Sequence, residues 1–328
     1  MKINGQFLDL YFQQYDRIDR KPGIIVHILW VMRRFISRPW RKNSNFGRFY
    51  FSNTQKNNSL LVMENLPTIE VVIVAKSEDL LLLKKVIIAA YNCSVNKITK
   101  ICLIVPFSEV TFCQDALKHL EFFDIINIVS EELIVSTSVI ELIRKERPDR
   151  FGWILQQVLV SEFILNSDSS GVLIVDSDTV LLRPKVWLDK FGRQLLMPTQ
   201  EMHMPYYDFL RESSSIYPFP QSSYVSHHML VQPVILREIL EVWAGQLELA
   251  LKKAFEFSSP EENSPFDLKY EIYAQYLLVK YPELVELNKW SNLSLPRKKL
   301  EEFLDGHEKA LSKSYNSVSF HHWNLDSI

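Results

Sequence analysis

The sequence has few cysteines and no hydrophobic run long enough to cross a membrane. Its three cysteines, Cys93, Cys102 and Cys113, are odd in number and fit no zinc-binding spacing. This usage predicts a reducing compartment and no disulfide framework. A bilayer span needs roughly 20 apolar residues. The most apolar N-terminal stretch, residues 23–36, is shorter and contains two arginines, so we expect neither a membrane span nor a signal peptide.

The chain also lacks a strong net charge and two common nucleotide-binding motifs. The formal net charge of its 328 residues is -2, so the whole protein carries no electrostatic signature of a nucleic-acid partner, and none is expected. Neither GxGxxG nor GxxxxGK[ST] occurs. The Rossmann dinucleotide-binding and P-loop interpretations therefore have no support from motifs.

The charge that is present is unevenly spread. Residues 1–60 carry eleven Lys and Arg side chains but three acidic ones. The polar stretch 52–59 is typical of a linker. We therefore divide the chain into a basic N-terminal extension, 1–64, and a main domain, 65–328. The apolar and basic stretch 23–42 is compatible with peripheral contact with an anionic membrane at its cytoplasmic face, or with a helix packed on the main domain.

The main domain shows strands alternating with helices. Apolar runs rich in β-branched residues predict strands, and broader apolar stripes predict helices. The predicted strands are 69–79, 100–109, 124–133, 171–182 and 194–201, and the predicted helices are 80–93, 112–120, 151–165 and a segment within 265–282. This alternation of strands and helices predicts an α/β fold with a mostly parallel sheet and helices on both faces. Ligands of such sheets lie beyond the carboxyl ends of the strands.

Two aspartates at the end of one predicted strand are the main candidates for chemistry. In GVLIVDSDTVLL, Asp176 and Asp178 follow four apolar residues. In an extended chain, residues i and i+2 point to the same face, so the two carboxylates would converge. A hard divalent cation, Mg²⁺ or Mn²⁺, would relieve their repulsion. The alternative is a solvated turn with an aspartate side-chain cap.

The segment VLIVDSDTVLLRP resembles the DxD segment of nucleotide-sugar-dependent glycosyltransferases with the GT-A fold. GWILQQ before it and SFHHW near the C-terminus are similar to a group of bacterial GT-A-like proteins. The resemblance implies a single Rossmann-like nucleotide-binding domain, with a mixed, mostly parallel sheet and a C-terminal acceptor region. It also implies a Mn²⁺ or Mg²⁺ cofactor and a nucleotide-sugar donor, with a UDP-sugar expected.

The same resemblance implies a set of metal and donor ligands. The metal would be held by Asp176 and Asp178 together with His321 or His322. Strand alternation places His321 on the face opposite Phe320, so His321 is preferred if Phe320 faces the core. For the donor nucleotide, Asp176 and four polar residues near the predicted first strand and the helix 151–165 are candidates: Lys76, Asp79, Gln156 and Gln157. Asp79 is equally explained as a helix cap.

Candidates for the acceptor side lie further along the chain. His227 and His228 fall where GT-A folds build the donor-sugar and acceptor pocket, and each is equally explained as a buried histidine with a backbone partner. Asp267 and Glu271 lie one helical turn apart. We expect Asp267 to cap the helix and Glu271 to reach into the pocket, where it would act as a base or bind a sugar hydroxyl. Asp267 is the alternative for the catalytic role, and His227 and His228 could also act in catalysis or contact sugar hydroxyls.

These candidates predict a metal-dependent glycosyltransferase that acts on a glycan or a lipid-linked acceptor. Two alternatives stay open at this point. One is a nucleotidyltransferase of similar α/β architecture, although AKSEDL is not the glycine-rich loop typical of that class. The other is a sugar-binding domain without catalytic activity.

Overall fold

The computed structural model describes residues 65–76, 80–199, 203–214, 216, 223–257, 266–300, 303 and 308–321. The basic extension 1–64, Asp79 and His322 lie outside the described residues. Within the described part, no helix is long and apolar enough to span a bilayer.

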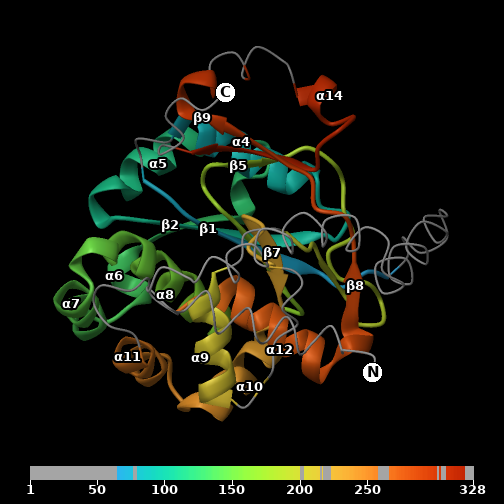
Figure 1. Ribbon diagram of the computed structural model, residues 1–328. Helices are drawn as coiled ribbons and strands as arrows, with labels where there is room; N and C mark the ends of the chain where they lie inside the picture. Colours follow the sequence, from blue (N-terminus) through green and yellow to red (C-terminus); the bar gives the residue numbers. More distant parts are fainter. Residues whose placement is uncertain are drawn as a thin grey trace, which may run out of the picture.

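A five-stranded sheet forms the centre of the molecule (Figure 1). Its strands lie in the order β3-β2-β1-β4-β7. β1, β2, β3 and β4 are parallel, and β7 runs antiparallel to β4. The strand bounds are β1 Ile69–Val74, β2 Ile98–Val105, β3 Ile126–Ser130, β4 Val172–Val175 and β7 His228–Val231. The mostly parallel mixed sheet predicted from the sequence is confirmed.

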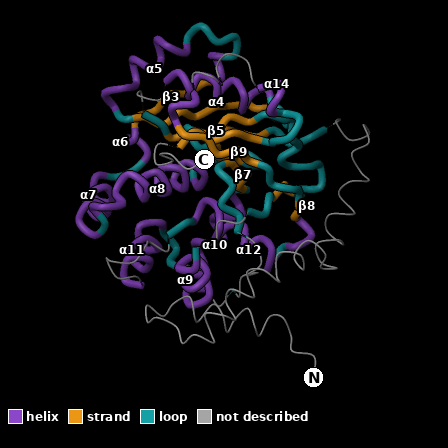
Figure 2. The backbone as a smooth tube through the Cα atoms, turned by 45° about the horizontal axis from the view of Figure 1, so that its top comes forward, coloured by secondary structure: helices purple, strands orange, loops and turns teal. Residues whose placement is uncertain are grey.

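Helices cover both faces of this sheet, as Figure 2 shows from a second direction. α4 (Leu80–Asn92) and α5 (Val110–Leu117) cover one face. The other face carries α8 (Phe151–Leu165) and α10 (Pro233–Trp243), with further helices packed around them. These further helices are α6 Glu131–Ile134, α7 Thr137–Glu146, α9 Met204–Ser214, α11 Leu247–Phe257 and α12 Tyr273–Lys280.

Side-chain alternation along the strands divides the core into two clusters. In β1, Val71 and Ile73 are buried under α4, whereas Val72 is buried under α8. Both faces of β4 are fully covered, which suits its unbroken apolar run. Each large apolar side chain buried in this way contributes about 1.5–3 kcal/mol. The core therefore fixes β1 and β4 side by side.

Two smaller sheets adjoin the central one. β5 (Thr179–Leu181), β10 (Ser317–His321) and β9 (Asn292–Pro296) form a three-stranded sheet, and β6 (Gln194–Leu196) pairs with β8 (Val285–Leu287). A short helix, α14 (Glu308–Leu311), precedes β10. The single strand predicted over 171–182 is therefore wrong: it is divided into β4 and β5, which belong to different sheets. The strand predicted over 194–201 is shortened to β6, outside the central sheet.

The order of the strands creates a switch point beside Asp176. The chain passes from β1 to β2 on one side, while β4 lies on the other side of β1. In open α/β sheets, ligands bind beyond the carboxyl ends of the strands where the winding direction reverses. The carboxyl end of β4, and with it the Asp176–Asp178 segment, lies at this position.

Candidate functional site

A tight turn, not an extended chain, carries the two aspartates. Residues 177 and 178 form a turn between β4 and β5, and the Thr179 N–H donates to the Asp176 carbonyl at 3.0 Å. The Asp176 N–H in turn donates to the carbonyl of His227 at 2.9 Å. The premise that an extended backbone directs both carboxylates to one face is therefore wrong. Their position is set by the turn and by the neighbouring strands.

The Asp176 carboxylate lies in a set of three polar partners. Its Oδ1 accepts from Lys269 Nζ at 3.0 Å and from the Tyr270 hydroxyl at 2.9 Å, and its Oδ2 lies 3.3 Å from His227 Nδ1. Burial acts to raise the pKa of Asp176, but the Lys269 charge and the His227 hydrogen bond outweigh it. The pKa of this carboxyl is therefore held below its usual range, and Asp176 is ionised at neutral pH.

The Asp178 carboxylate has a different set of partners. Its Oδ2 lies 3.0 Å from His321 Nδ1, and its Oδ1 accepts from the Thr179 hydroxyl at 3.0 Å. The antiparallel pairing of β10 with β5 brings the two residues together, since the Phe320 N–H donates to the Asp178 carbonyl at 2.9 Å. Phe320 is fully buried in the core. The predicted arrangement, with Phe320 in the core and His321 on the opposite face, is therefore observed, whereas the metal-ligand roles of Asp178 and His321 stay predictions.

The two aspartate–histidine pairs lie side by side. The rings of His227 and His321 are 5.1 Å apart between centroids. His227 has a φ of 63°, a left-handed conformation that costs an L-residue roughly 1–2 kcal/mol. The fold holds this strained residue where its carbonyl and its ring both contact Asp176. Backbone strain of this kind clusters at functional sites.

A short π-helix supplies the partners of Asp176 that sequence reasoning missed. η5 (Leu268–Ile272) has a π-helical turn, which is uncommon and often found at functional sites. Its consecutive residues Lys269 and Tyr270 both contact Oδ1 of Asp176. Nothing in the sequence marks Lys269, because a lysine in a helical segment normally extends into solvent. Tyr270 lies in a tyrosine-rich segment, and packing alone would explain an aromatic residue there.

The structure places Asp267 and Glu271 at the start of the same segment. Asp267 Oδ2 accepts from the Glu271 N–H at 3.2 Å, so the predicted capping role of Asp267 is confirmed. Its Oδ1 is buried and has no hydrogen-bond partner among the described residues. Burial raises the pKa of Asp267 to about 7. Asp267 is therefore a buried carboxyl that can hold a proton near neutral pH.

Glu271 lies among protein hydrogen-bond donors. It is 1% exposed. Its Oε2 accepts from the Ser223 hydroxyl at 2.7 Å and from the Tyr224 N–H at 2.8 Å, and its Oε1 accepts from Gln275 at 2.8 Å. Glu271 therefore ties η5 to the segment 223–226, directly before His227. Its predicted role as a base or sugar ligand stays a prediction.

We expect Glu271→Gln to destabilise the fold. Both carboxylate oxygens accept hydrogen bonds, and an amide would turn an NH₂ group toward one set of donors. A buried polar group left unsatisfied costs about 1–3 kcal/mol, which urea unfolding would measure. Glu248→Gln on α11, which removes a partly exposed i,i+4 pair with Lys252, is the control and should change stability by less than about 0.5 kcal/mol. Unchanged stability in Glu271→Gln, with a large fall in activity, would instead support the catalytic role.

The remaining predicted residues that the structure describes differ in their burial. His228 is buried, and neither ring nitrogen has a partner among the described residues; its ring packs edge-on against Trp187. Gln157 is buried on α8 with its Oε1 unpaired within the described part, whereas Gln156 is half-buried. Lys76 is exposed just after β1. The ligand roles of these residues stay predictions, as do those of Asp79 and His322.

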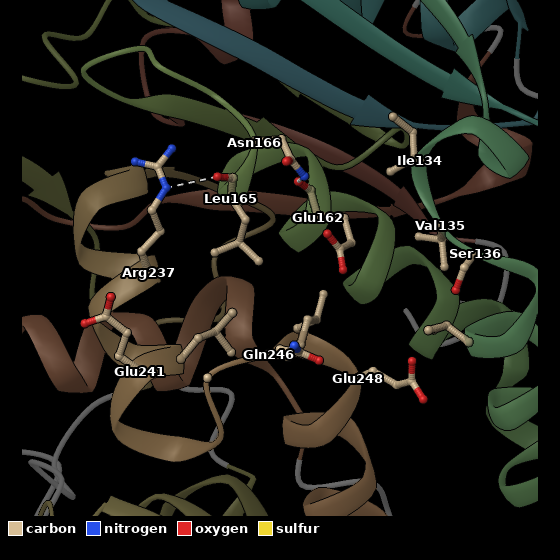
Figure 3. A pocket seen from close by; sticks show the side chains of 14 residues that line it. Ile134, Val135, Ser136, Glu162, Leu165, Asn166, Arg237, Glu241, Gln246 and Glu248 are labelled. Atoms are coloured by element: carbon tan, nitrogen blue, oxygen red, sulfur yellow. Dashed lines mark hydrogen bonds between the residues drawn. The ribbon is translucent and has the colours of Figure 1, made fainter.

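The cavity in Figure 3 is separate from this site. It has a volume of about 500 Å³ and lies between α7, α8, α10 and α11. The carboxylates of Glu162, Glu241 and Glu248 line it together with Arg237, which donates to the Leu165 carbonyl at 3.0 Å. It shares no residue with the surroundings of Asp176 and Asp178.

The donor set around the turn suits a divalent cation in its chemistry. Two ligands about 2.1 Å from an octahedral ion, at right angles, lie about 3.0 Å apart. The Asp178–His321 contact, at 3.0 Å, equals this separation, and the Asp176–His227 contact, at 3.3 Å, is close to it, although both are hydrogen bonds in the metal-free protein. Among the described residues, however, no group of three or more His, Cys, Asp or Glu side chains is arranged to hold a metal ion. The residues around the turn therefore suit a metal ion in the type of their ligand atoms and in the distance within each aspartate–histidine pair.

No family model matches the chain, and the search of curated proteins found no match. The chain is similar to several solved glycosyltransferase structures. With mouse xyloside xylosyltransferase 1 it shares 11% identity and a TM-score of 0.43, over 80% of this chain and 100% of the other. With the galactosyltransferase LgtC it shares 10% identity and a TM-score of 0.42, over 76% of this chain and 86% of the other. With the mannosyltransferase Ktr4p of S. cerevisiae it shares 8% identity and a TM-score of 0.45, over 70% of each chain. At these values the likeness carries no argument on activity.

Proposed function

We propose that this chain is a metal-dependent glycosyltransferase that moves a sugar from a nucleotide-sugar to a glycan or a lipid-linked acceptor. The observation that carries the proposal is the position of the two aspartate–histidine pairs. They lie beyond the carboxyl end of β4, at the switch point between β1 and β4. Such a position is where α/β sheets bind nucleotides.

Four residues of the chain would take part in binding the metal at this site. Asp178 and His321 would hold the divalent cation, and His227 and Asp176 would complete its surroundings. When bound, the cation would offset the charge that develops on the nucleoside diphosphate as it leaves. The histidines must be neutral to act as ligands, and the hydrogen bond made by the second ring nitrogen would fix their orientation.

The presence of imidazole favours Mn²⁺ over Mg²⁺ as the cation. Mg²⁺ prefers oxygen ligands and binds through one or two carboxylates together with substrate phosphates and water. Affinity for nitrogen-containing sites rises along the first transition series. A site that combines carboxylates with His227 and His321 therefore accepts a transition metal more readily than Mg²⁺. Mn²⁺ is the first-row ion that shares the preference of Mg²⁺ for carboxylate and phosphate oxygens, and we propose it as the working ion because it suits both kinds of ligand.

The donor would lie over the exits of β1 and β4. Lys76 and Asp79, which follow β1, would contact its phosphate and its base or ribose, and Gln156 and Gln157 on α8 would approach the nucleotide. A UDP-sugar is the proposed donor. The acceptor would enter from the side of His227 and His228. Contact between the basic extension 1–64 and the cytoplasmic face of a membrane belongs to the same proposal, because a lipid-linked acceptor would lie there.

A thermal-shift screen tests this function. We expect a UDP-sugar together with Mn²⁺ to stabilise the protein, by about 2.7 kcal/mol at 100 times its Kd, and to do so less with Mg²⁺. Each ligand without metal is the control. Stabilisation by a nucleoside triphosphate but not by nucleotide-sugars would identify a nucleotidyltransferase. A response to free sugars alone would indicate a binding domain without transferase activity.

A further inference from the structure

Among the residues that the structure describes, a lysine pairs with Asp176 but not with Asp178. Lys269 Nζ lies 3.0 Å from Asp176 Oδ1. Among the described residues, no lysine or arginine forms an ion pair with Asp178, whose charged-group contact is His321. One carboxylate of the proposed metal site therefore already has a cation beside it.

Lys269 is built into the protein interior. Its side chain is 2% exposed, compared with 18% for Asp176. Nζ also lies 4.6 Å from the centre of the Tyr270 ring, over its face. Moving such an ammonium group away from its carboxylate within a low-dielectric interior is costly, because a buried charge needs a partner. Lys269 is therefore a fixed part of the site.

The π-helical turn of η5 fixes this arrangement from both ends. Its first turn is capped by Asp267, and Glu271 anchors it to Ser223 and Tyr224. Between these anchors, Lys269 and Tyr270 reach the same oxygen of Asp176. The local backbone thus directs two donors, one of them charged, to Oδ1 of the carboxylate whose Oδ2 faces His227 and the proposed metal site.

We propose that Lys269 is a positioning residue that acts through Asp176: its ammonium group competes with the divalent cation and limits the affinity of the site for it. The proposal rests on the function proposed above. With Lys269 present, Asp176 is neutralised without metal, so Asp178 and His321 provide most of the attraction for the cation. The ion would be held loosely enough to exchange together with the nucleotide, and the site would keep its shape when the metal is absent.

Lys269→Met, with Lys269→Arg as the charge-retaining control, tests the competition. Without nucleotide, Mn²⁺ should bind Lys269→Met at least about tenfold more tightly than the wild type, because a carboxylate is released for it. The melting temperature without metal should fall, and its rise on addition of Mn²⁺ should be larger than in the wild type. Lys269→Arg should stay close to the wild type in both measurements. Calorimetric titration measures the affinity for Mn²⁺, and thermal unfolding measures the melting temperature.

A second variant separates this role from a purely structural one. In Lys269→Met/Asp176→Asn both charges are removed, so the metal-free protein should regain stability while the gain in Mn²⁺ affinity disappears. If Mn²⁺ binds Lys269→Met no more tightly than the wild type, or binds none of the variants, the competition proposed for Lys269 is wrong. Because no nucleotide is present, failure of the proposed function would appear separately, as absent nucleotide-sugar binding while these Mn²⁺ effects persist.

Discussion

Asp178→Asn is expected to weaken Mn²⁺ binding by on the order of 100-fold. The amide keeps the size of the side chain and one acceptor oxygen for the Thr179 hydroxyl, but it removes the charge that faces His321. Because no lysine or arginine among the described residues neutralises Asp178, its full charge is available to the cation. Nucleotide-sugar binding that depends on Mn²⁺ should be lost together with the metal.

The fold should survive this substitution. The Asp178 side chain is 25% exposed, and the turn itself is held by backbone hydrogen bonds of Asp176, Thr179 and Phe320. We therefore expect the free energy of unfolding without metal to change by less than about 1 kcal/mol, as for a partly exposed ion pair. Urea unfolding of the metal-free protein measures this quantity.

Calorimetric titration of Mn²⁺ in the presence of UDP is the decisive measurement. Asp115→Asn, which removes an exposed pair with Lys118 on α5, is the matched control and should bind Mn²⁺ as the wild type does. Wild-type affinity in Asp178→Asn would show that the aspartate is not a metal ligand. Lost affinity together with lost secondary structure would show instead that the turn depends on this carboxylate.

Much of the framework of this site is visible in the sequence. Helix α8 has the predicted bounds, 151–165, because its broad apolar stripe leaves little choice of structure. The exit of β4 is marked by an apolar run that ends in Asp176 and Asp178. The preference for His321 followed from strand alternation and needed only the assumption that Phe320 is buried, which is correct.

The remaining features depend on contacts distant in sequence. The segment 171–182 has strand propensity on both sides of Asp176–Asp178, and its pairing with β10, about 140 residues later, shows that it divides there into two strands of different sheets. The contact between Lys269 and Asp176 spans 93 positions. A π-helical turn cannot be told from an α-helical one by apolar periodicity over five residues. Local patterns therefore locate the site but leave out the charge that compensates Asp176.

Two buried groups give the fold opposite responses to acid. Burial, aided by the charge of His227, lowers the pKa of His228 to about 3, whereas burial raises the pKa of Asp267 to about 7. The ordinary pKa values are 6.5 for histidine and 3.8 for aspartate. For His228, the unfolded chain binds the proton more tightly, so its stabilising contribution is complete above pH 6.5 and is lost as the pH falls toward 3. For Asp267, the contribution is complete below pH 3.8 and is lost as the pH rises through 7.

Between pH 3.8 and 6.5 these two contributions change in opposite directions. Each changes by about 1.4 kcal/mol per pH unit when its group is fully protonated in one state and deprotonated in the other. In the wild type they largely cancel. We therefore expect His228→Phe to become more stable relative to the wild type as the pH falls from 6.5 to 4.5, by about 2–3 kcal/mol. Asp267→Asn should become less stable by a similar amount over the same range.

The substitutions are chosen so that they remove little else. Neither ring nitrogen of His228 has a partner among the described residues, and phenylalanine keeps an aromatic edge against Trp187. Asparagine at 267 keeps an acceptor for the Glu271 N–H. Urea unfolding of each variant and of the double variant, at pH 4.5 and 6.5, measures the effect. The double variant should follow the wild-type pH dependence, and His119→Gln on the exposed surface should do the same.

The result also decides which imidazole is available for chemistry. A His228 that excludes the proton down to about pH 3 cannot act as a general acid or base near neutral pH, because efficient proton transfer needs a pKa close to the working pH. Of the pair, half-buried His227, whose Nδ1 lies 3.3 Å from Asp176 Oδ2, would then be the one available to the site, in the metal surroundings proposed for it. If His228→Phe instead follows the wild type in acid, the folded protein protonates His228 as readily as the unfolded chain does. The buried position would then hold a partner for this histidine, and His228 would return as a candidate for the acceptor side of the site.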